Sequence, residues 1–118
     1  MYIMSTQTRT PAAYIVDDDP AIRDSLALLL GIRGIRCHPY DSAERFLDAV
    51  RPDWRGCVLI DLQLAGLDGL QLQAALAARK VEMPVIFVTG HGDVAAARNA
   101  LKAGALDFVE KPVDPDRL

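Results

Sequence analysis

The sequence predicts an α/β domain built on a doubly wound, five-stranded parallel sheet with strand order 2-1-3-4-5. Three observations lead to this fold class. Short apolar runs of strand length alternate with segments whose apolar residues recur at helical spacing. Four of these runs end in a charged or hydroxyl residue, a pattern typical of strands that end at the carboxyl edge of a parallel sheet. Right-handed crossovers between consecutive parallel strands then favour the doubly wound arrangement.

Composition limits what this domain can do. The chain has 118 residues, which suits one domain, and its hydrophobic fraction of 51% supports a real core. The formal net charge of -3 and the lack of a basic block argue against a nucleic-acid-binding surface, so any DNA contact would need another domain. No apolar stretch approaches the ~20 residues of a membrane span. Residues 1–12 lack the features of a signal peptide and are predicted to be a flexible leader to a domain at 13–118.

The two cysteines, Cys37 and Cys57, have no metal-binding spacing. We expect reduced core thiols in a cytoplasmic protein rather than a disulfide.

The first strand is predicted at residues 13–17. Asp19 followed by Pro20 is typical of a helix N-cap with proline at the first helical position. Gly34 ends this helix. Its buried stripe consists of four apolar residues: Ile22, Leu26, Leu29 and Leu30.

A short second strand follows at residues 35–39. Ser42 is predicted to cap the second helix, which ends at the breaking segment 51–53. The third strand covers residues 57–62, a turn occupies 66–69, and the third helix runs from Leu70 to about Lys80.

The fourth strand is predicted at residues 85–89, followed by a flexible glycine-containing loop at 90–92. Asp93 caps an alanine-rich helix that ends at Gly104, and the fifth strand covers 106–110. Residues 114–116 indicate the start of a last helix, most of which is missing because the sequence stops at residue 118.

Carboxylates follow two of the predicted strands. Asp17 and Asp18 come directly after the first strand, and Asp61 lies at the end of the third. Two charges ~4 Å apart repel by roughly 4 kcal/mol at an effective dielectric near 20, so a proton or a cation must lie among them. A small set of oxygen ligands suits Mg²⁺, which keeps several waters. A solvated turn would explain Asp17 and Asp18 alone, but Asp61 on a neighbouring strand favours a magnesium site.

The same edge has the groups that phosphoryl transfer requires. Asp61 follows an apolar strand, so its carboxylate is held rigidly at a partly desolvated edge and can act as a nucleophile toward phosphorus. Phosphoryl transfer depends mainly on positioning and charge neutralisation. Mg²⁺ supplies part of that charge and Lys111 the rest, while Thr89 can donate a hydrogen bond to a phosphoryl oxygen.

Taken together, these residues resemble the receiver domain of two-component response regulators over residues 13–113. The order and spacing of five motifs are specific, although each motif alone is weak. The motifs are Ile15-Val16-Asp17-Asp18, Leu59-Ile60-Asp61-Leu62, Gly66-Leu67-Asp68-Gly69, Val88-Thr89-Gly90 and Glu110-Lys111-Pro112. The segments 88–94 and 102–112 are most similar to the FixJ-type branch. The resemblance implies the flavodoxin-like fold of that family.

The resemblance also implies a role for each site residue. Asp61 would be the phosphoacceptor, receiving the phosphoryl group from a histidine kinase. Mg²⁺ would be bound directly by Asp18 and Asp61, by Asp17 mostly through water, and by the backbone carbonyl of Gln63. The domain would catalyse only its own phosphorylation and dephosphorylation, so it would not be an enzyme with a separate product.

The implied output is a conformational switch. Thr89 and Lys111 would hold the phosphoryl group, Phe108 would occupy the family's aromatic switch position, and His91 lies close enough in sequence to take part. The helix after residue 93 would then change its surface and promote a homodimer. A DNA-binding effector domain, absent from this sequence, would carry transcription regulation. Ala65 departs from the proline that the family usually has, which predicts a looser loop there.

Three alternatives remain at this stage. A haloacid dehalogenase-type hydrolase also uses a strand-end aspartate, but it requires a carboxylate where this chain has Gln63, and a cap domain. A flavodoxin-like cofactor binder needs a phosphate loop after the first strand, where three aspartates would repel phosphate. A scaffold with a silent site is disfavoured by the complete set of aspartates with Thr89 and Lys111.

Overall fold

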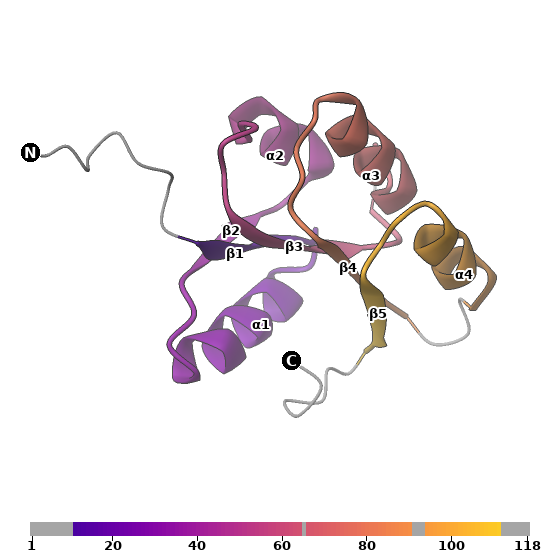
Figure 1. Cartoon of the computed structure of the whole chain (residues 1–118). Helices are drawn as coiled ribbons and strands as arrows, with labels where there is room; N and C mark the ends of the chain where they lie inside the picture. The colour runs from indigo at the N-terminus through magenta and orange to yellow at the C-terminus, as the bar shows by residue number, and fades with distance from the viewer. Residues whose placement is uncertain (1–10, 65, 91–93, 112–118) are drawn as a thin grey trace, which may run out of the picture.

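The computed structural model describes residues 11–64, 66–90 and 94–111, and it confirms the predicted fold class (Figure 1). All five strands are parallel and lie in the order β2-β1-β3-β4-β5. The strands are β1 (Ala12–Val16), β2 (Cys37–Tyr40), β3 (Gly56–Asp61), β4 (Val85–Thr89) and β5 (Asp107–Glu110). The helices are α1 (Pro20–Ile32), α2 (Ala43–Ala49), α3 (Gly69–Ala78) and α4 (Val94–Lys102).

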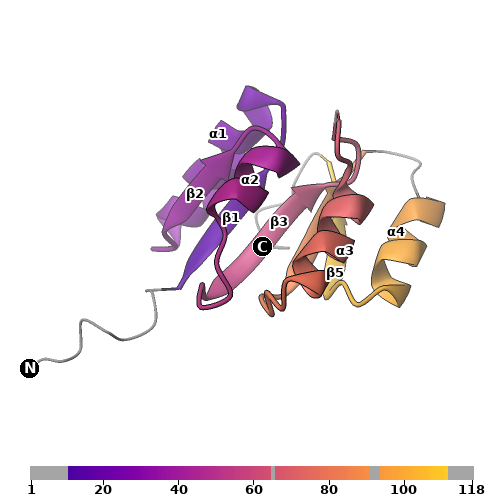
Figure 2. The same ribbon diagram turned by 90° about the horizontal axis from the view of Figure 1, so that it is seen from above.

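The helices lie on both faces of the sheet. Figures 1 and 2 show α1 on one face and α2, α3 and α4 on the other. Each face has its own hydrophobic cluster: Leu26 and Leu30 of α1 pack on Ile15 and Val88, whereas Tyr14 and Phe87 belong to the larger cluster on the opposite face. Because alternate strand residues point to opposite faces, each buried strand contributes to both clusters.

The predicted helix starts are confirmed where the structure describes them. Asp19 is the N-cap of α1, and its side chain accepts a hydrogen bond from the backbone N–H of Ala21, with proline at the first position. Ser42 caps α2 in the same way. Asp68 and Gln71 form a capping box at the start of α3. Gly34, with φ of 78°, takes the left-handed conformation that ends the segment after α1.

Strand boundaries differ from the prediction by one or two residues. β1 begins at Ala12 rather than Ala13, because Ala12 pairs with Gly56 and extends the ladder backwards. Gly56 has φ of 125°, and a Cβ there would lie 1.8 Å from the carbonyl oxygen of Ala12, so only glycine allows the two strands to begin together. β2 begins at Cys37, later than predicted. The leader predicted at 1–12 therefore extends too far, because Ala12 belongs to β1. Residues 1–10, the looser loop predicted at Ala65, the cap at Asp93 and the last helix lie outside the described residues.

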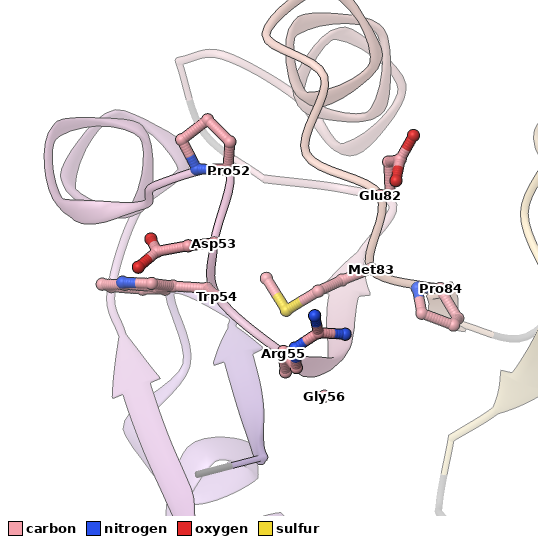
Figure 3. Close-up of a pocket in the computed structure, with 8 residues that line it drawn as sticks. All are labelled: Pro52, Asp53, Trp54, Arg55, Gly56, Glu82, Met83 and Pro84. Atoms are coloured by element: carbon pink, nitrogen blue, oxygen red, sulfur yellow. The ribbon is translucent and has the colours of Figure 1, made fainter. Parts of the chain in front are cut away.

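An aromatic cluster fills the space beneath α2. The ring of Tyr14 stacks between Trp54, with centroids 4.8 Å apart, and His38 at 5.6 Å. Trp54 also lines a hollow of about 200 Å³ with Arg55 and Met83 (Figure 3). These residues precede β3 and β4, so the hollow lies at the amino edge of the sheet, away from the aspartates that follow the strands.

Both cysteines are free thiols, as predicted, and burial raises the pKa of each above its ordinary value of 9.0. Among the described residues, no helix has both the length and the apolar character needed to cross a membrane.

Candidate functional site

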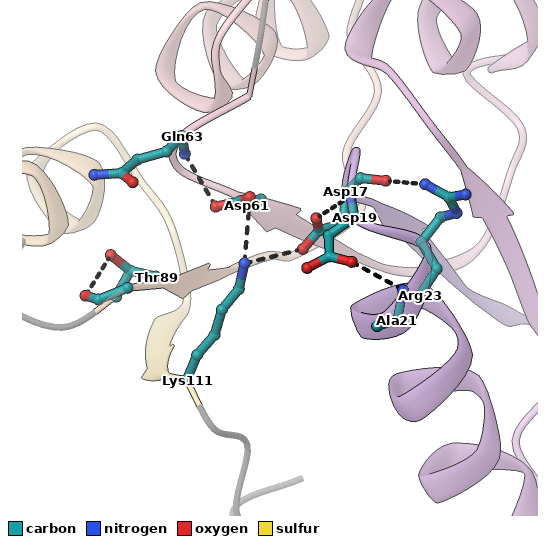
Figure 4. A network of polar contacts seen from close by, with 9 residues as sticks. Asp17, Asp19, Ala21, Arg23, Asp61, Gln63, Thr89 and Lys111 are labelled. Carbon is teal, nitrogen blue, oxygen red and sulfur yellow. Dashed lines mark hydrogen bonds and ion pairs between the residues drawn. The ribbon is translucent and has the colours of Figure 1, made fainter.

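The register of the sheet brings the predicted site residues to one edge. Val16 pairs with Ile60, so Asp17 directly follows β1 beside Asp61, the last residue of β3. On the other side, Thr89 ends β4 and pairs with Glu110, after which Lys111 leaves β5. Parallel strands end at a common edge of the sheet. These residues are far apart in the sequence but lie close together in space, because each lies at the end of a strand. Figure 4 shows their side chains around this edge.

Three carboxylates meet at the centre of the site. Asp17, Asp18 and Asp61 each have one oxygen atom such that all three atoms lie within 4.8 Å of one another. Asp17 and Asp61 are buried, with 1% and 6% of their surface exposed, while Asp18 is exposed. The group is therefore open to solvent on one side and enclosed by the sheet on the other.

The ammonium of Lys111 lies between two of these carboxylates. Its Nζ is 3.2 Å from Oδ2 of Asp17 and 3.3 Å from Oδ2 of Asp61 (Figure 4). Burial by itself lowers the pKa of Lys111, but the charges of Asp61 and Asp17 outweigh that effect, and the net pKa is raised. The side chain of Lys111 is consequently protonated and positively charged at neutral pH, as the sequence predicts.

Asp17 is under opposing influences. Burial raises its pKa above the ordinary value of 3.8, and the negative charge of Asp61 raises it further. The backbone N–H of Asp19, which donates to Oδ1 at 2.9 Å, and the ammonium of Lys111 lower the pKa but do not cancel the rise. Burial and the charge of Asp61 therefore make the ionised form of Asp17 less favourable than that of an exposed aspartate.

Asp61 is fixed by two contacts. Its Oδ1 accepts a hydrogen bond from the backbone N–H of Gln63 at 3.0 Å, and its Oδ2 contacts Lys111. Its carboxylate thus has a defined orientation at the end of a buried strand. This rigidity is what a nucleophile for in-line attack requires.

The cluster of three carboxylates, Asp17, Asp18 and Asp61, can bind a small hard cation. Two oxygens bound to one Mg²⁺ ion lie at most ~4.2 Å apart. The three carboxylate oxygens lie within 4.8 Å of one another, so they would need to move only slightly closer to bind one ion. Oδ2 of Asp17 is buried, and although Lys111 lies 3.2 Å away, no donor in the described part of the chain makes an aligned hydrogen bond to it. That oxygen has a lone pair available to a metal. The donor set is all oxygen, as Mg²⁺ prefers.

The remaining predicted residues lie farther from the carboxylates. Thr89 is buried, and its hydroxyl donates to the backbone carbonyl of Gly90 at 3.3 Å. Figure 4 shows it to one side of Asp61. Phe108 is half-buried in β5, pairs with Phe87 in the sheet register, and packs on the core cluster that includes Ala97 of α4. His91 lies outside the described residues.

Two contacts near the site are not foreseen by the sequence reasoning. Nη1 of Arg23 in α1 donates to the backbone carbonyl of Asp17 at 2.7 Å. Oε2 of Glu44 in α2 accepts from the backbone N–H of Leu67 at 3.0 Å. Each links a helix to a loop beside the aspartates. Helical spacing alone could place Arg23 one turn beyond Asp19, but no sequence signal links Glu44 to a residue 23 positions away.

The fold and this edge define a doubly wound α/β domain with a carboxylate site at the carboxyl ends of its strands. A family model for the response regulator receiver domain matches residues 13–118. The chain therefore belongs to the response regulator receiver domain family. The resemblance inferred from the five motifs is confirmed.

Curated relatives support the same assignment. The chain is 46% identical over 105 residues to the transcriptional regulatory protein FixJ of Bradyrhizobium diazoefficiens, which covers 89% of this chain and 51% of that protein. It is 39% identical over 104 residues to the C4-dicarboxylate transport transcriptional regulatory protein DctD of Pseudomonas aeruginosa, covering 88% of this chain and 22% of that protein. The chain thus spans about half the length of the FixJ relative and less of DctD.

Solved structures agree with the fold. The crystal structure of FixJ-N matches with a TM-score of 0.81 at 42% identity, covering 90% of this chain and 85% of that chain. A low-resolution structure of the response regulator StyR matches with a TM-score of 0.86 at 36% identity, covering 92% of this chain and 55% of that chain. The similarity to the FixJ-type branch is therefore seen in both sequence and structure.

Proposed function

We propose that this domain is a phosphorylation-controlled signalling switch whose phosphoacceptor is Asp61. The observation that carries the proposal is the placement of the Asp61 carboxylate, held between the Lys111 ammonium and the Gln63 amide and beside Asp17. A histidine kinase is the proposed donor. An Asp61 oxygen attacks phosphorus, the bond from phosphorus to the kinase's imidazole nitrogen breaks, and an acyl phosphate remains on Asp61.

Each neighbouring group has a role in this proposal. Asp17, Asp18 and Asp61, with the carbonyl of Gln63, would hold Mg²⁺, which neutralises charge on the transferring phosphoryl group. Lys111 contributes a second positive charge beside Asp17 and Asp61. Thr89 lies at the end of the next strand, and its hydroxyl would leave Gly90 to donate to a phosphoryl oxygen.

The output would be association through α4 and β5. A shift of Thr89 and of the segment after it would change the space available to Phe108, which packs on the cluster that includes α4. A phosphorylation-dependent homodimer would then control a DNA-binding effector, since the relatives FixJ and DctD are transcriptional regulatory proteins. We place the protein in the cytoplasm, where ATP and Mg²⁺ support kinase phosphorylation.

Intact mass spectrometry tests the proposal directly. The chain is incubated with Mg²⁺ and acetyl phosphate or carbamoyl phosphate, and a gain of one phosphoryl group is expected. Asp61→Asn should show no gain, whereas Asp53→Asn, an exposed carboxylate at the amino edge of the sheet, should react like the parent. A parent that never gains mass, or a gain that persists in Asp61→Asn, would refute the proposal.

A further inference from the structure

One carboxylate outside the acidic site contacts the loop that follows Asp61. Glu44 lies in the first turn of α2, and its Oε2 accepts a hydrogen bond from the backbone N–H of Leu67 at 3.0 Å. The two residues are 23 positions apart, so this hydrogen bond connects α2 to the loop between β3 and α3. It is a charge-assisted bond to a backbone donor, a class stronger than a neutral pair.

The glycine at position 66 leaves room for this carboxylate beside the loop backbone. Gly66 has φ of 72°, a left-handed conformation that glycine adopts without strain. A Cβ added at Gly66 would lie only 2.9 Å from Oε2 of Glu44. The absence of a side chain at Gly66 therefore allows the Glu44 carboxylate to reach the N–H of Leu67.

Further contacts hold the two ends of the same loop. At the start, the N–H of Gln63 donates to Asp61, and the side chain of Leu64 is buried in the core. At the end, Asp68 forms the capping box of α3. The hydrogen bond from Leu67 to Glu44 holds the loop between these two ends.

We propose that Glu44 is a positioning residue for the Asp61 site. Its hydrogen bond to Leu67 holds the β3–α3 loop in the conformation that presents the Gln63 carbonyl and the Asp61 carboxylate to one cation. This inference rests on the function proposed above. Metal affinity depends on outer groups that fix the orientation of the ligands, so a loosened loop should weaken Mg²⁺ binding without changing the ligands themselves.

A competing explanation involves charge alone. Glu44 carries a negative charge on the same side of the sheet as α3, and any negative charge near the site favours a cation over long range. Two conservative variants separate the explanations. Glu44→Gln removes the charge but keeps an oxygen acceptor at the same reach, whereas Glu44→Asp keeps the charge but shortens the side chain by one methylene.

The first measurement is Mg²⁺ affinity by calorimetry on the unphosphorylated chain. Glu44→Asp should weaken Mg²⁺ binding about threefold to tenfold, as expected from the loss of one net hydrogen bond. Glu44→Gln should bind within about twofold of the parent, which corresponds to less than ~0.5 kcal/mol. Asp48→Asn, which neutralises an exposed carboxylate on the same helix, is the matched control and should bind like the parent.

The second measurement is the rate of phosphorylation by acetyl phosphate as a function of Mg²⁺ concentration. In Glu44→Asp the Mg²⁺ midpoint should rise while the rate at saturating Mg²⁺ is unchanged, because only loop positioning is altered. The amide proton resonance of Leu67 should move upfield in Glu44→Asp and stay close to its parent position in Glu44→Gln. A purely structural role would lower the melting temperature and leave the Mg²⁺ midpoint unchanged.

The outcomes are distinguishable. If Glu44→Gln weakens Mg²⁺ binding and Glu44→Asp does not, long-range charge is the cause and the positioning role is overturned. If both variants bind like the parent, the contact has no role at the site. If the parent itself neither binds Mg²⁺ nor accepts a phosphoryl group, the proposed function fails, independently of Glu44.

Discussion

The Nζ atom of Lys111 lies 3.3 Å from Oδ2 of Asp61, and the same ammonium is 3.2 Å from Oδ2 of Asp17. In the absence of a metal, one lysine therefore neutralises part of the charge of two buried carboxylates. The side chain of Lys111 keeps 22% of its surface exposed, so solvent screens these ion pairs to some degree. The stability of the domain should depend on this lysine most strongly when Mg²⁺ is absent.

Lys111→Met should destabilise the metal-free domain by about 1–2 kcal/mol, because two carboxylates lose their partner while the apolar stem is retained. Urea unfolding in the presence of EDTA measures this difference. The folded pKa of Lys111 is raised, so its contribution is fully present below the ordinary value of 10.5 and is lost as the pH rises through the folded pKa. The difference between parent and variant should thus persist at neutral pH and shrink at high pH.

Lys102→Met provides the control for the lysine prediction, since Lys102 is an exposed lysine in the last turn of α4. It should change the free energy of unfolding by less than ~0.5 kcal/mol. Equal stability of Lys111→Met and the parent in EDTA would show that the two ion pairs contribute nothing.

Magnesium should stabilise the domain by binding to the folded state. At ten times the dissociation constant the expected gain is about 1.4 kcal/mol, and Asp18→Asn should reduce it more than Asp17→Asn. Oδ1 of Asp17 accepts a hydrogen bond from the Asp19 amide, and the charge of Asp17 is already partly neutralised by Lys111, so a metal gains less from Asp17 even though its Oδ2 keeps a lone pair. Asp18 is the exposed member of the three carboxylates.

The melting temperature is the appropriate measure of Mg²⁺ binding. Trp54 lines the hollow at the amino edge of the sheet, so its fluorescence follows unfolding rather than events at the aspartates (Figure 3). CaCl₂ and NaCl titrations at matched ionic strength separate specific binding from screening. A melting temperature that does not respond to Mg²⁺ would contradict the metal site.

Asp17→Asn should change the pH dependence of stability in a defined direction. The folded pKa of Asp17 is raised above 3.8, mainly by burial, so its stabilising effect is fully present below pH 3.8 and is lost as the pH rises through the folded pKa. In EDTA, the stability of Asp17→Asn relative to the parent should therefore increase as the pH rises from below 3.8 into the neutral range.

Denaturant unfolding curves at several pH values test the Asp17 prediction. Asp24→Asn replaces an exposed carboxylate in α1 and is the control. Its free energy of unfolding should differ from that of the parent by the same amount at every pH in this range. A difference between Asp17→Asn and the parent that falls with rising pH would show that Asp17 is stabilised in its ionised form, contrary to its burial beside Asp61.

Much of the fold could be predicted because local signals agree with the global pattern. The N-cap at Asp19, the cap at Ser42 and the glycine at Gly34 are short-range features, and the structure has each of them where the sequence indicates. The topology follows from the alternation of strands and helices. Strand ends were less predictable, as at Ala12, because pairing with a neighbouring strand decides where a ladder begins.

The site was predictable for the same reason that the fold was. Parallel strands end at one edge, so residues at strand ends had to meet, and Asp17, Asp61 and Lys111 do meet. The contacts of Arg23 and Glu44 could not be predicted. Both are made by long side chains that reach backbone groups, and their partners depend on the separation between helix and loop, which no periodicity encodes.

In the proposed switch, Thr89 would couple the phosphoryl site to the α4 surface, and this coupling can be tested at one side chain. In this structure the Thr89 hydroxyl donates to the backbone carbonyl of its neighbour, Gly90. After phosphorylation of Asp61 it would donate to a phosphoryl oxygen instead. Thr89→Ala should still accept a phosphoryl group, because Asp61 and Lys111 are unchanged. Its phosphorylated form should dimerise at least about tenfold more weakly than the phosphorylated parent, corresponding to ~1.4 kcal/mol of lost coupling.

Sedimentation velocity of phosphorylated and unphosphorylated samples measures this coupling, with the phosphorylated fraction determined by intact mass. Thr89→Ser keeps the hydroxyl and should dimerise like the parent, which separates the hydrogen bond from the loss of a buried methyl group. Leu101→Ser, at an exposed apolar position of α4, should reduce dimerisation without reducing phosphorylation if α4 forms the interface. Full dimerisation by phosphorylated Thr89→Ala, or equal association with and without the phosphoryl group in the parent, would refute the coupling. Because Thr89 and Leu101 lie in different elements, agreement between their effects would show that one transition connects the two.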